Sequence, residues 1–201
     1  MEIPGIQVWI GLRNKHKNMD IQTTDIEGVY YFKKNLVGDQ RGHFTRLFCE
    51  NELGDVLQGR QIKQINHSYT KDVGSVRGIH FQKPPHAEMK FISCLKGRVL
   101  DIAVDIRAGS ATFLNYCALE LSAENQKTII IPEGFAHGFQ VLEEGSELLY
   151  FHTEFYNPDF EGGLRYDDPA LSIDWPLVAR NISERDQRHP LINNNFNGLG
   201  V

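Results

Sequence analysis

The stretch RGIHFQKPPHAEMK, residues 77–90, gathers histidine, glutamate, arginine and lysine side chains within fourteen positions. Another histidine, His137, follows in IPEGFAHGF at 131–139. Histidine and glutamate can hold a metal ion, and a histidine can also move a proton near neutral pH. The first question is therefore which of these two kinds of site the sequence builds.

A metal centre is the first alternative. Cupins, a jelly-roll family, carry a motif of histidines and a glutamate and then a motif PxGxxH, which the stretch 131–138 matches. The first motif is poorly matched, because Gln82 stands two residues after His80 where a metal site needs a second histidine. A fixed ammonium on Lys90 would also oppose a bound cation. The candidate ligands that remain are His80, His86 and Glu88.

Proton transfer is the second alternative. A histidine is a good general base when a carboxylate fixes its tautomer and stabilises its charged form. The carbanion that forms is stabilised as an enolate when its oxygen contacts a positively charged donor. Lys90 can be this donor if a turn brings its strand beside the strand of His80. Inverting a stereocentre needs an acid on the opposite face, a role that suits Tyr150 in ELLYF.

Each of these residues also has a structural explanation. A lone strand histidine is often structural, and Tyr150 can be a core residue. Asp186 ends the Ser-x-x-Asp capping box of SERD, residues 183–186, so its first role is to cap a helix. Spacing alone leaves the function open.

Strand patterns dominate the elements that must position these side chains. RVLDIAVDI at 98–106 alternates, with Leu100, Ile102 and Val104 on one face and aspartates on the other. Further strand runs are GVYYFKKN, KTIIIPEG and SELLYFHTEFY, and helical patterns are short, at 51–59 and 183–190. We expect an all-β fold, a jelly-roll sandwich or barrel of cupin type with a few short helices.

The composition limits the classes of function. A chain of 201 residues suits one domain, and its net charge of -5 gives no basic surface for nucleic acid or for an anionic membrane. No apolar run resembles a signal peptide or a membrane span. Three widely spaced cysteines, Cys49, Cys94 and Cys117, predict free thiols in a reducing cytoplasm. We expect an N-terminal extension at 1–24, a domain at 25–190 and a loose C-terminal tail at 191–201.

Blocks of residues between 25 and 190 resemble the dTDP-4-dehydrorhamnose 3,5-epimerase family of metal-free cupins. The blocks run in order as GDQRGHF (38–44), QINHS (64–68), RGIHFQ (77–82), Lys90, GRVLDIAVDIRAGSATF (97–113), LSAEN (121–125), IPEGFAHGF (131–139), ELLY (147–150), DDPALSIDWP (167–176) and SERD (183–186).

The resemblance implies roles for individual residues. His80 would be the general base, Asp186 its partner carboxylate, Tyr150 the acid on the opposite face and Lys90 a contact near the sugar ketone. The implied substrate-binding residues are Arg41 and Arg77 on the diphosphate, His137 near the ketone, Phe155 stacked on the nucleotide base, and Gln64, Asn66 and His67 in the pocket lining.

The resemblance also implies the reaction. An epimerase of this kind inverts C3 and/or C5 of a nucleotide-linked 4-keto-6-deoxyhexose, turning dTDP-4-keto-6-deoxyglucose into dTDP-4-keto-rhamnose without a metal or other cofactor. It would be a cytoplasmic homodimer. Arg46 stands where the family often has a glutamate, which bears on the choice of nucleotide and sugar. The alternatives are a monoepimerase acting on a related sugar and a metal-dependent cupin oxygenase or isomerase.

Overall fold

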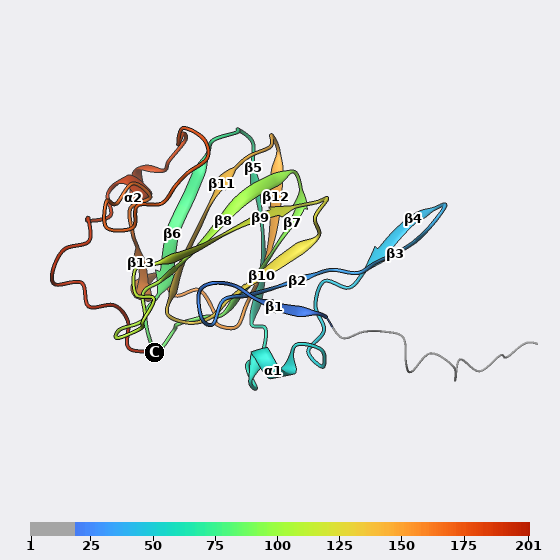
Figure 1. Cartoon of the computed structure of the whole chain (residues 1–201), viewed down its shortest axis with the longest axis horizontal. Helices are drawn as coiled ribbons and strands as arrows, with labels where there is room; N and C mark the ends of the chain where they lie inside the picture. The colour runs from blue at the N-terminus through green and yellow to red at the C-terminus, as the bar shows by residue number, and fades with distance from the viewer. Residues whose placement is uncertain (1–18) are drawn as a thin grey trace, which may run out of the picture.

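Most strand-forming runs pair into two antiparallel sheets in the computed structural model, which describes residues 19–201 (Figure 1). The first sheet has the order β1 (Ile21–Thr23), β2 (Tyr30–Lys33), β10 (Lys127–Ile131), β7 (Lys90–Lys96), β12 (Ser146–His152) and β5 (Gln64–Thr70). The second has the order β13 (Glu161–Gly163), β6 (Val76–Gln82), β11 (Phe135–Val141), β8 (Arg98–Asp105) and β9 (Tyr116–Ser122). The predicted all-β sandwich of cupin type is confirmed.

Apolar side chains fill the space between the sheets. Ile92 of β7 and Leu148 of β12 meet Val99 of β8 and Phe139 of β11 in one buried cluster. The outer face of the first sheet is covered by the segment around α1 (Gly54–Leu57), whose neighbour Leu53 is fully buried. Because both sheets are covered, β8 is buried almost throughout rather than on one face only.

The C-terminal segment covers the outer face of the second sheet. Ile192, Phe196 and Leu199 pack on the buried cluster that includes Ile102 and Val104. Leu199 also exchanges backbone hydrogen bonds with the chain around Arg107, with its N–H 2.7 Å from the carbonyl of Ile106. The tail expected to be loose at 191–201 is therefore packed, because it supplies apolar side chains to an otherwise uncovered sheet.

The N-terminal boundary also differs from the expectation. Strand β1 begins at Ile21 and pairs with β2 in the register Ile21 to Phe32, so the first sheet starts inside the extension expected at 1–24. The rest of that expected extension, 1–18, lies outside the described residues.

Two helical patterns form, each for a single turn. α1 spans Gly54–Leu57 and α2 spans Glu184–Gln187, and a 3-10 turn, Pro158–Phe160, lies between them in sequence. Ser183 caps α2 by accepting a hydrogen bond from the Asp186 N–H. A separate hairpin, β3 (Leu36–Asp39) and β4 (Gly42–Thr45), projects from the body of the molecule (Figure 1).

Two further expectations are met by the described residues. Cys49, Cys94 and Cys117 are free thiols, as their spacing predicted. Within 19–201, none of the helices has the length and apolar character needed to cross a membrane.

Candidate active site

A cavity of about 1120 Å³ has walls from both sheets. Strands β5 and β12 supply one wall, β6 and β11 the other, and the start of α2 borders it. Histidine, lysine, tyrosine and carboxylate side chains are among the residues that line it. Polar groups in a concave site need partners or a ligand, so this cavity is the candidate active site.

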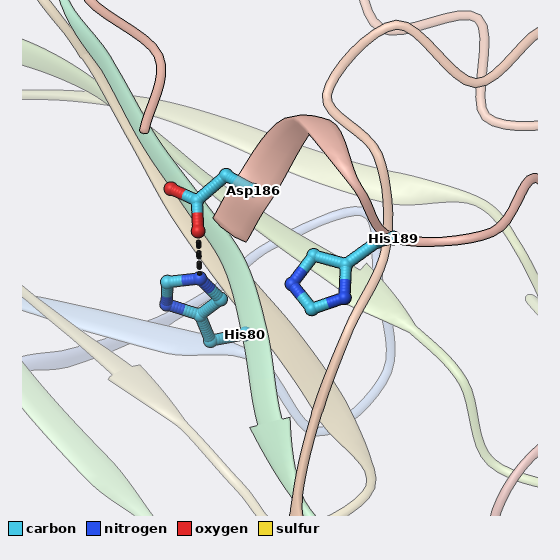
Figure 2. A group of neighbouring side chains, drawn as sticks. All are labelled: His80, Asp186 and His189. Carbon is cyan, nitrogen blue, oxygen red and sulfur yellow. Dashed lines mark hydrogen bonds and ion pairs between the residues drawn. The ribbon is translucent and has the colours of Figure 1, made fainter. Parts of the chain in front are cut away.

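His80 and Asp186 form a hydrogen-bonded pair in the wall of the cavity. His80 Nε2 lies 2.8 Å from Asp186 Oδ1, and Asp186 Oδ2 accepts a hydrogen bond from the Gly78 N–H at 3.3 Å. The short helix α2 presents Asp186 to strand β6, as Figure 2 shows. Since Nε2 faces the carboxylate, Nδ1 of His80 is the nitrogen left to accept a proton.

The Asp186 carboxylate is held ionised by its surroundings. Burial alone would raise its pKa, but the hydrogen bond and charge of His80, with the Gly78 N–H, lower the pKa to about 2. An ionised carboxylate fixes the Nε2–H tautomer of the imidazole and stabilises the imidazolium. Asp186 therefore does more than the capping role that SERD predicted. Its backbone N–H donates the capping hydrogen bond to the Ser183 hydroxyl, while its side chain binds His80.

Tyr150 approaches the cavity from the other sheet. It lies on β12, and its hydroxyl is 3.1 Å from the hydroxyl of Ser68 on β5. Its ring meets His137 edge to face at 6.2 Å and stacks on His152 at 6.0 Å. Burial raises the pKa of Tyr150 strongly, with the Ser68 hydrogen bond only partly opposing this. The phenol is therefore protonated at neutral pH and is available as an acid.

His137 is fixed beneath the cavity by a buried aspartate. Its Nε2 lies 2.8 Å from Oδ2 of Asp101, a fully buried residue of the neighbouring strand β8. Burial raises the pKa of Asp101, and the charge and hydrogen bond of His137 oppose that effect. The inward-facing position of Asp101 explains why the alternating strand 98–106 carries an aspartate inside the sandwich.

A glycine lets β6 approach β11 closely beside His137. A Cβ on Gly78 would lie 2.6 Å from the carbonyl oxygen of His137, and Gly78 has a φ of +104°. Both the space and the backbone conformation favour glycine. The RG dipeptide at 77–78 therefore helps to set the position of His80.

Lys90 shares a carboxylate with His152. Its Nζ lies 3.1 Å from Oε1 of Glu88, whose Oε2 is 2.7 Å from Nδ1 of His152. His152 Nε2 in turn lies 3.3 Å from the amide of Asn66. Burial would raise the pKa of Glu88, but the charge of Lys90 and the hydrogen bond of His152 lower it overall. This ion pair holds the ammonium in the cavity.

Other expected binding residues lie at the wall of the cavity on β5 and β6. Asn66, His67 and Arg77 all line it. His67 Nε2 is 3.1 Å from Glu147, and one Arg77 guanidinium nitrogen is 3.3 Å from the Thr70 hydroxyl. The guanidinium is exposed, so it can reach an anion at the entrance.

Three expected binding residues do not line this cavity. Arg41 lies on the projecting hairpin with its side chain 85% exposed, paired with Asp39. Gln64 is not among the lining residues, and its side chain accepts a hydrogen bond from the N–H of Tyr156, which does line the cavity. Phe155 is 58% exposed, and the following residue, Tyr156, lines the cavity in its place.

Several site residues were missed in the sequence. His152 stands two residues after Tyr150 in a strand, so the period-2 rule places both on one face and could have identified it. Glu88 was considered only as a metal ligand. Arg185, which lies 3.2 Å from His80 Nε2, is on α2, and His189, beside the His80–Asp186 pair, follows that helix. The return of this segment to β6 has no local sequence signal.

The candidate cupin metal ligands are not brought together. His86 lies outside the cavity lining, 3.2 Å from Asn157 and against Phe160, and Glu88 is engaged with Lys90 and His152. Among residues 19–201, one group of metal-binding side chains does converge, and it comprises His80, Asp186 and His189, with ligand atoms within 4.8 Å of one another.

Comparisons with known proteins show the family of the chain. Residues 23–194 match the family model for dTDP-4-dehydrorhamnose 3,5-epimerase. The enzyme of that name from Shigella flexneri is 37% identical over 169 residues, which cover 84% of this chain and 93% of the relative. The Legionella pneumophila epimerase crystallised with dTDP-4-keto-L-rhamnose has a TM-score of 0.82 at 37% identity, covering 86% of this chain and 92% of that one. The Elizabethkingia anophelis enzyme has a TM-score of 0.83 at 37% identity, covering 90% and 100%.

Proposed function

The chain belongs to the dTDP-4-dehydrorhamnose 3,5-epimerase family, and from that membership we propose that it is an isomerase converting dTDP-4-keto-6-deoxyglucose into dTDP-4-keto-rhamnose. The reaction inverts C3 and C5 of the sugar, the two carbons beside the 4-keto group. The observation that carries the proposal is that a histidine–aspartate pair on one sheet and a protonated tyrosine on the other flank a single cavity.

Proton removal falls to His80. The 4-keto group acidifies the hydrogens on both adjacent carbons, and Nδ1 of His80 accepts one of them. The imidazolium that results is stabilised by Asp186 at Nε2, 2.8 Å away. A positioned general base of this kind contributes roughly a hundredfold to ten-thousandfold in rate.

Lys90 and His137 stabilise the enolate. The negative charge that leaves the carbon collects on the 4-keto oxygen, where a preorganised cation or hydrogen-bond donor is most effective. Lys90 is held by Glu88 at 3.1 Å, and His137 is held by Asp101 at 2.8 Å. Because the substrate carbonyl takes the electron pair, the proposed mechanism uses no cofactor.

Tyr150 returns a proton from the opposite face. Its phenol loses a proton to the carbon while His80 has gained one, so each inversion moves one proton across the ring plane. Exchange with water resets both groups, and a shift of the ring then presents the second carbon to the same pair.

The nucleotide and diphosphate position the ring. Arg77 at the cavity wall is suited to a phosphate, because a guanidinium makes paired hydrogen bonds to phosphate oxygens. Asn66 and His67 contact the ligand from β5. Phe155 and Gln64 lie next to Tyr156 and contact the thymine of the nucleotide. Holding the remote end of the substrate places the reacting carbon over His80.

We further propose a homodimer in which Arg41 serves the partner's cavity. The hairpin that carries Arg41 exposes Leu36, Val37 and Phe44, with 72% of Phe44 accessible. Strand β5 is an edge strand with Ile65 and Tyr69 exposed. An uncovered apolar hairpin and a bare strand edge are surfaces that a second copy would cover. A cytoplasmic location fits the three free thiols.

Heavy water tests the reaction directly. The chain is incubated with dTDP-4-keto-6-deoxyglucose in D₂O, and mass spectrometry and NMR locate the deuterium on the ring. We expect incorporation at both C3 and C5, with accumulation of the rhamnose-configured ketone. Label at one carbon only would identify a monoepimerase, and no label at either carbon would overturn the proposal.

His80→Ala provides the matched test of the base. It should slow incorporation at both carbons by about a hundredfold or more. His86→Ala is the control, because His86 is a histidine of the same stretch that lies outside the cavity lining. Equal rates for the two variants would contradict the assignment of His80.

A further inference from the structure

We propose that His80, Asp186 and His189 form an inhibitory site for a zinc-like divalent ion. Two imidazoles and one carboxylate are a ligand set that suits zinc, whereas calcium and magnesium prefer oxygen alone. The three ligand atoms already lie within 4.8 Å of one another. The binding of zinc does not depend on the proposed function, while the inhibition does.

The third ligand, His189, is the feature that the epimerase mechanism leaves unused. Figure 2 shows its Nε2 turned toward the His80–Asp186 pair. This nitrogen is buried, and among residues 19–201 it has no hydrogen-bond partner. An unpaired buried nitrogen is unfavourable, so its lone pair is available to an ion that enters the group.

Gly163 makes the room for this imidazole. It pairs with His80 across β13 and β6, and a Cβ at Gly163 would lie 2.1 Å from His189 Nε2. Zinc sits about 2.0–2.2 Å from such ligands, so a tetrahedral site needs ligand atoms about 3.4 Å apart. His189 can supply the approach of up to about 1.4 Å by side-chain rotation, because its Nε2 gives up no hydrogen bond.

Arg185 is the charge that the ion must displace. Its guanidinium lies 3.2 Å from His80 Nε2 and 3.6 Å from Asp186. The side chain is 56% exposed and is also paired with Glu161 at 2.9 Å. Arg185 can therefore turn toward solvent while keeping Glu161. The ion then binds the Asp186 carboxylate in place of Arg185.

Zinc at this position would prevent His80 from accepting a proton, and it would do so without occupying the substrate cavity. A metal on Nε2 moves the remaining imidazole proton to Nδ1, so the nitrogen that faces the substrate can no longer accept one. No net proton is released from His80, because only its tautomer changes. Inhibition should consequently lower kcat and leave KM nearly unchanged.

Binding is measured without substrate. Zinc is titrated into the apo chain by calorimetry, and Co²⁺ is titrated while its visible absorption is recorded. We expect one ion per chain and the absorption of a tetrahedral nitrogen–oxygen site, with no thiolate charge-transfer band. His189→Ala should weaken the binding by at least about tenfold to a hundredfold, by analogy with the loss of supporting contacts. Gly163→Ala should weaken it similarly with all the histidines retained, and His86→Ala should not.

Activity provides the second readout. Zinc should reduce kcat of the wild-type chain, EDTA should restore it, and His189→Ala should stay active in the presence of zinc. Equal zinc or cobalt binding by the wild type and His189→Ala would overturn the site. Binding that leaves kcat intact, or that raises KM instead, would overturn the inhibition. An inactive wild-type chain that still binds cobalt through His189 would contradict the proposed function and not the metal site.

Discussion

At the residue scale, the reaction that we propose places different chemical requirements on His80 and on Tyr150. His80 must be able to gain a proton and is paired with an ionised carboxylate. Tyr150 must hold a proton until the enolate forms, and burial keeps its phenol protonated. The environments therefore separate a base from an acid.

Tyr150→Phe tests this separation. Removing the hydroxyl should reduce inversion by about a hundredfold or more, while His80 still exchanges hydrogen at the carbon that it faces. The measurement compares deuterium incorporation with the formation of inverted product in D₂O. Ser68→Ala is the control, because it removes the hydroxyl partner of Tyr150 at 3.1 Å and leaves the phenol. Equal loss of exchange and inversion in Tyr150→Phe would show that another group reprotonates the carbon.

At the element scale, Asp105 ties the end of β8 to the loop that follows. It accepts hydrogen bonds from Arg107, Ser110 and Thr112. Burial would raise its pKa, but these partners, Arg107 first, lower the pKa to about 2. The cluster holds the far end of the strand that carries Asp101, and so supports the position of His137.

Asp105→Asn should lower the free energy of unfolding by roughly 2 kcal/mol at pH 7. A carboxyl whose pKa is depressed in the folded state stabilises the protein fully above its ordinary pKa, 3.8, and loses this effect as the pH falls through about 2. Urea titrations at several pH values should therefore show wild type and variant converging between pH 4 and pH 2. A constant difference across that range would mean that the Asp105 charge is not the cause. Asp167→Asn, at a more exposed pair, is the control.

The elements differ in how far the sequence predicts them. The alternation in 98–106 predicted a strand, and Ser-x-x-Asp predicted a capped turn, because both signals depend on near neighbours. The packing of Leu199 against Ile106 and the reach of Asp186 to His80 connect residues far apart in the chain, so no local pattern specifies them. His80, Tyr150 and Lys90 were candidates by residue type and the resemblance then implied their roles, whereas the Glu88–His152 contact is visible only in the folded chain.

At the scale of the whole molecule, the hairpin β3–β4 is the element that the single chain leaves uncovered. Its Arg41 is remote from the cavity lining of its own chain, although the family resemblance assigns it to the diphosphate. A homodimer in which each hairpin reaches the other subunit would satisfy both observations.

Subunit mixing tests this arrangement. Arg41→Ala and His80→Ala chains should each be impaired, and the mixed dimer should regain one working cavity, which has its own His80 and the partner's Arg41. At an equal ratio of the two chains, random reassociation makes about half of the dimers mixed, each with one working cavity of two, so about a quarter of wild-type activity should return. Light scattering gives the mass of each species. No recovery on mixing, or a monomeric mass, would contradict the proposal.

The placement of His80 on β6 and Tyr150 on β12 has an evolutionary consequence. In the proposed mechanism, the distance between the two proton-transfer groups depends on the thickness of the apolar layer between the sheets, to which Ile92 and Leu148 belong. A methyl group gained or lost deep in that layer would alter the spacing of the two reacting groups. Stereochemical outcome is therefore exposed to drift at positions that never meet the sugar.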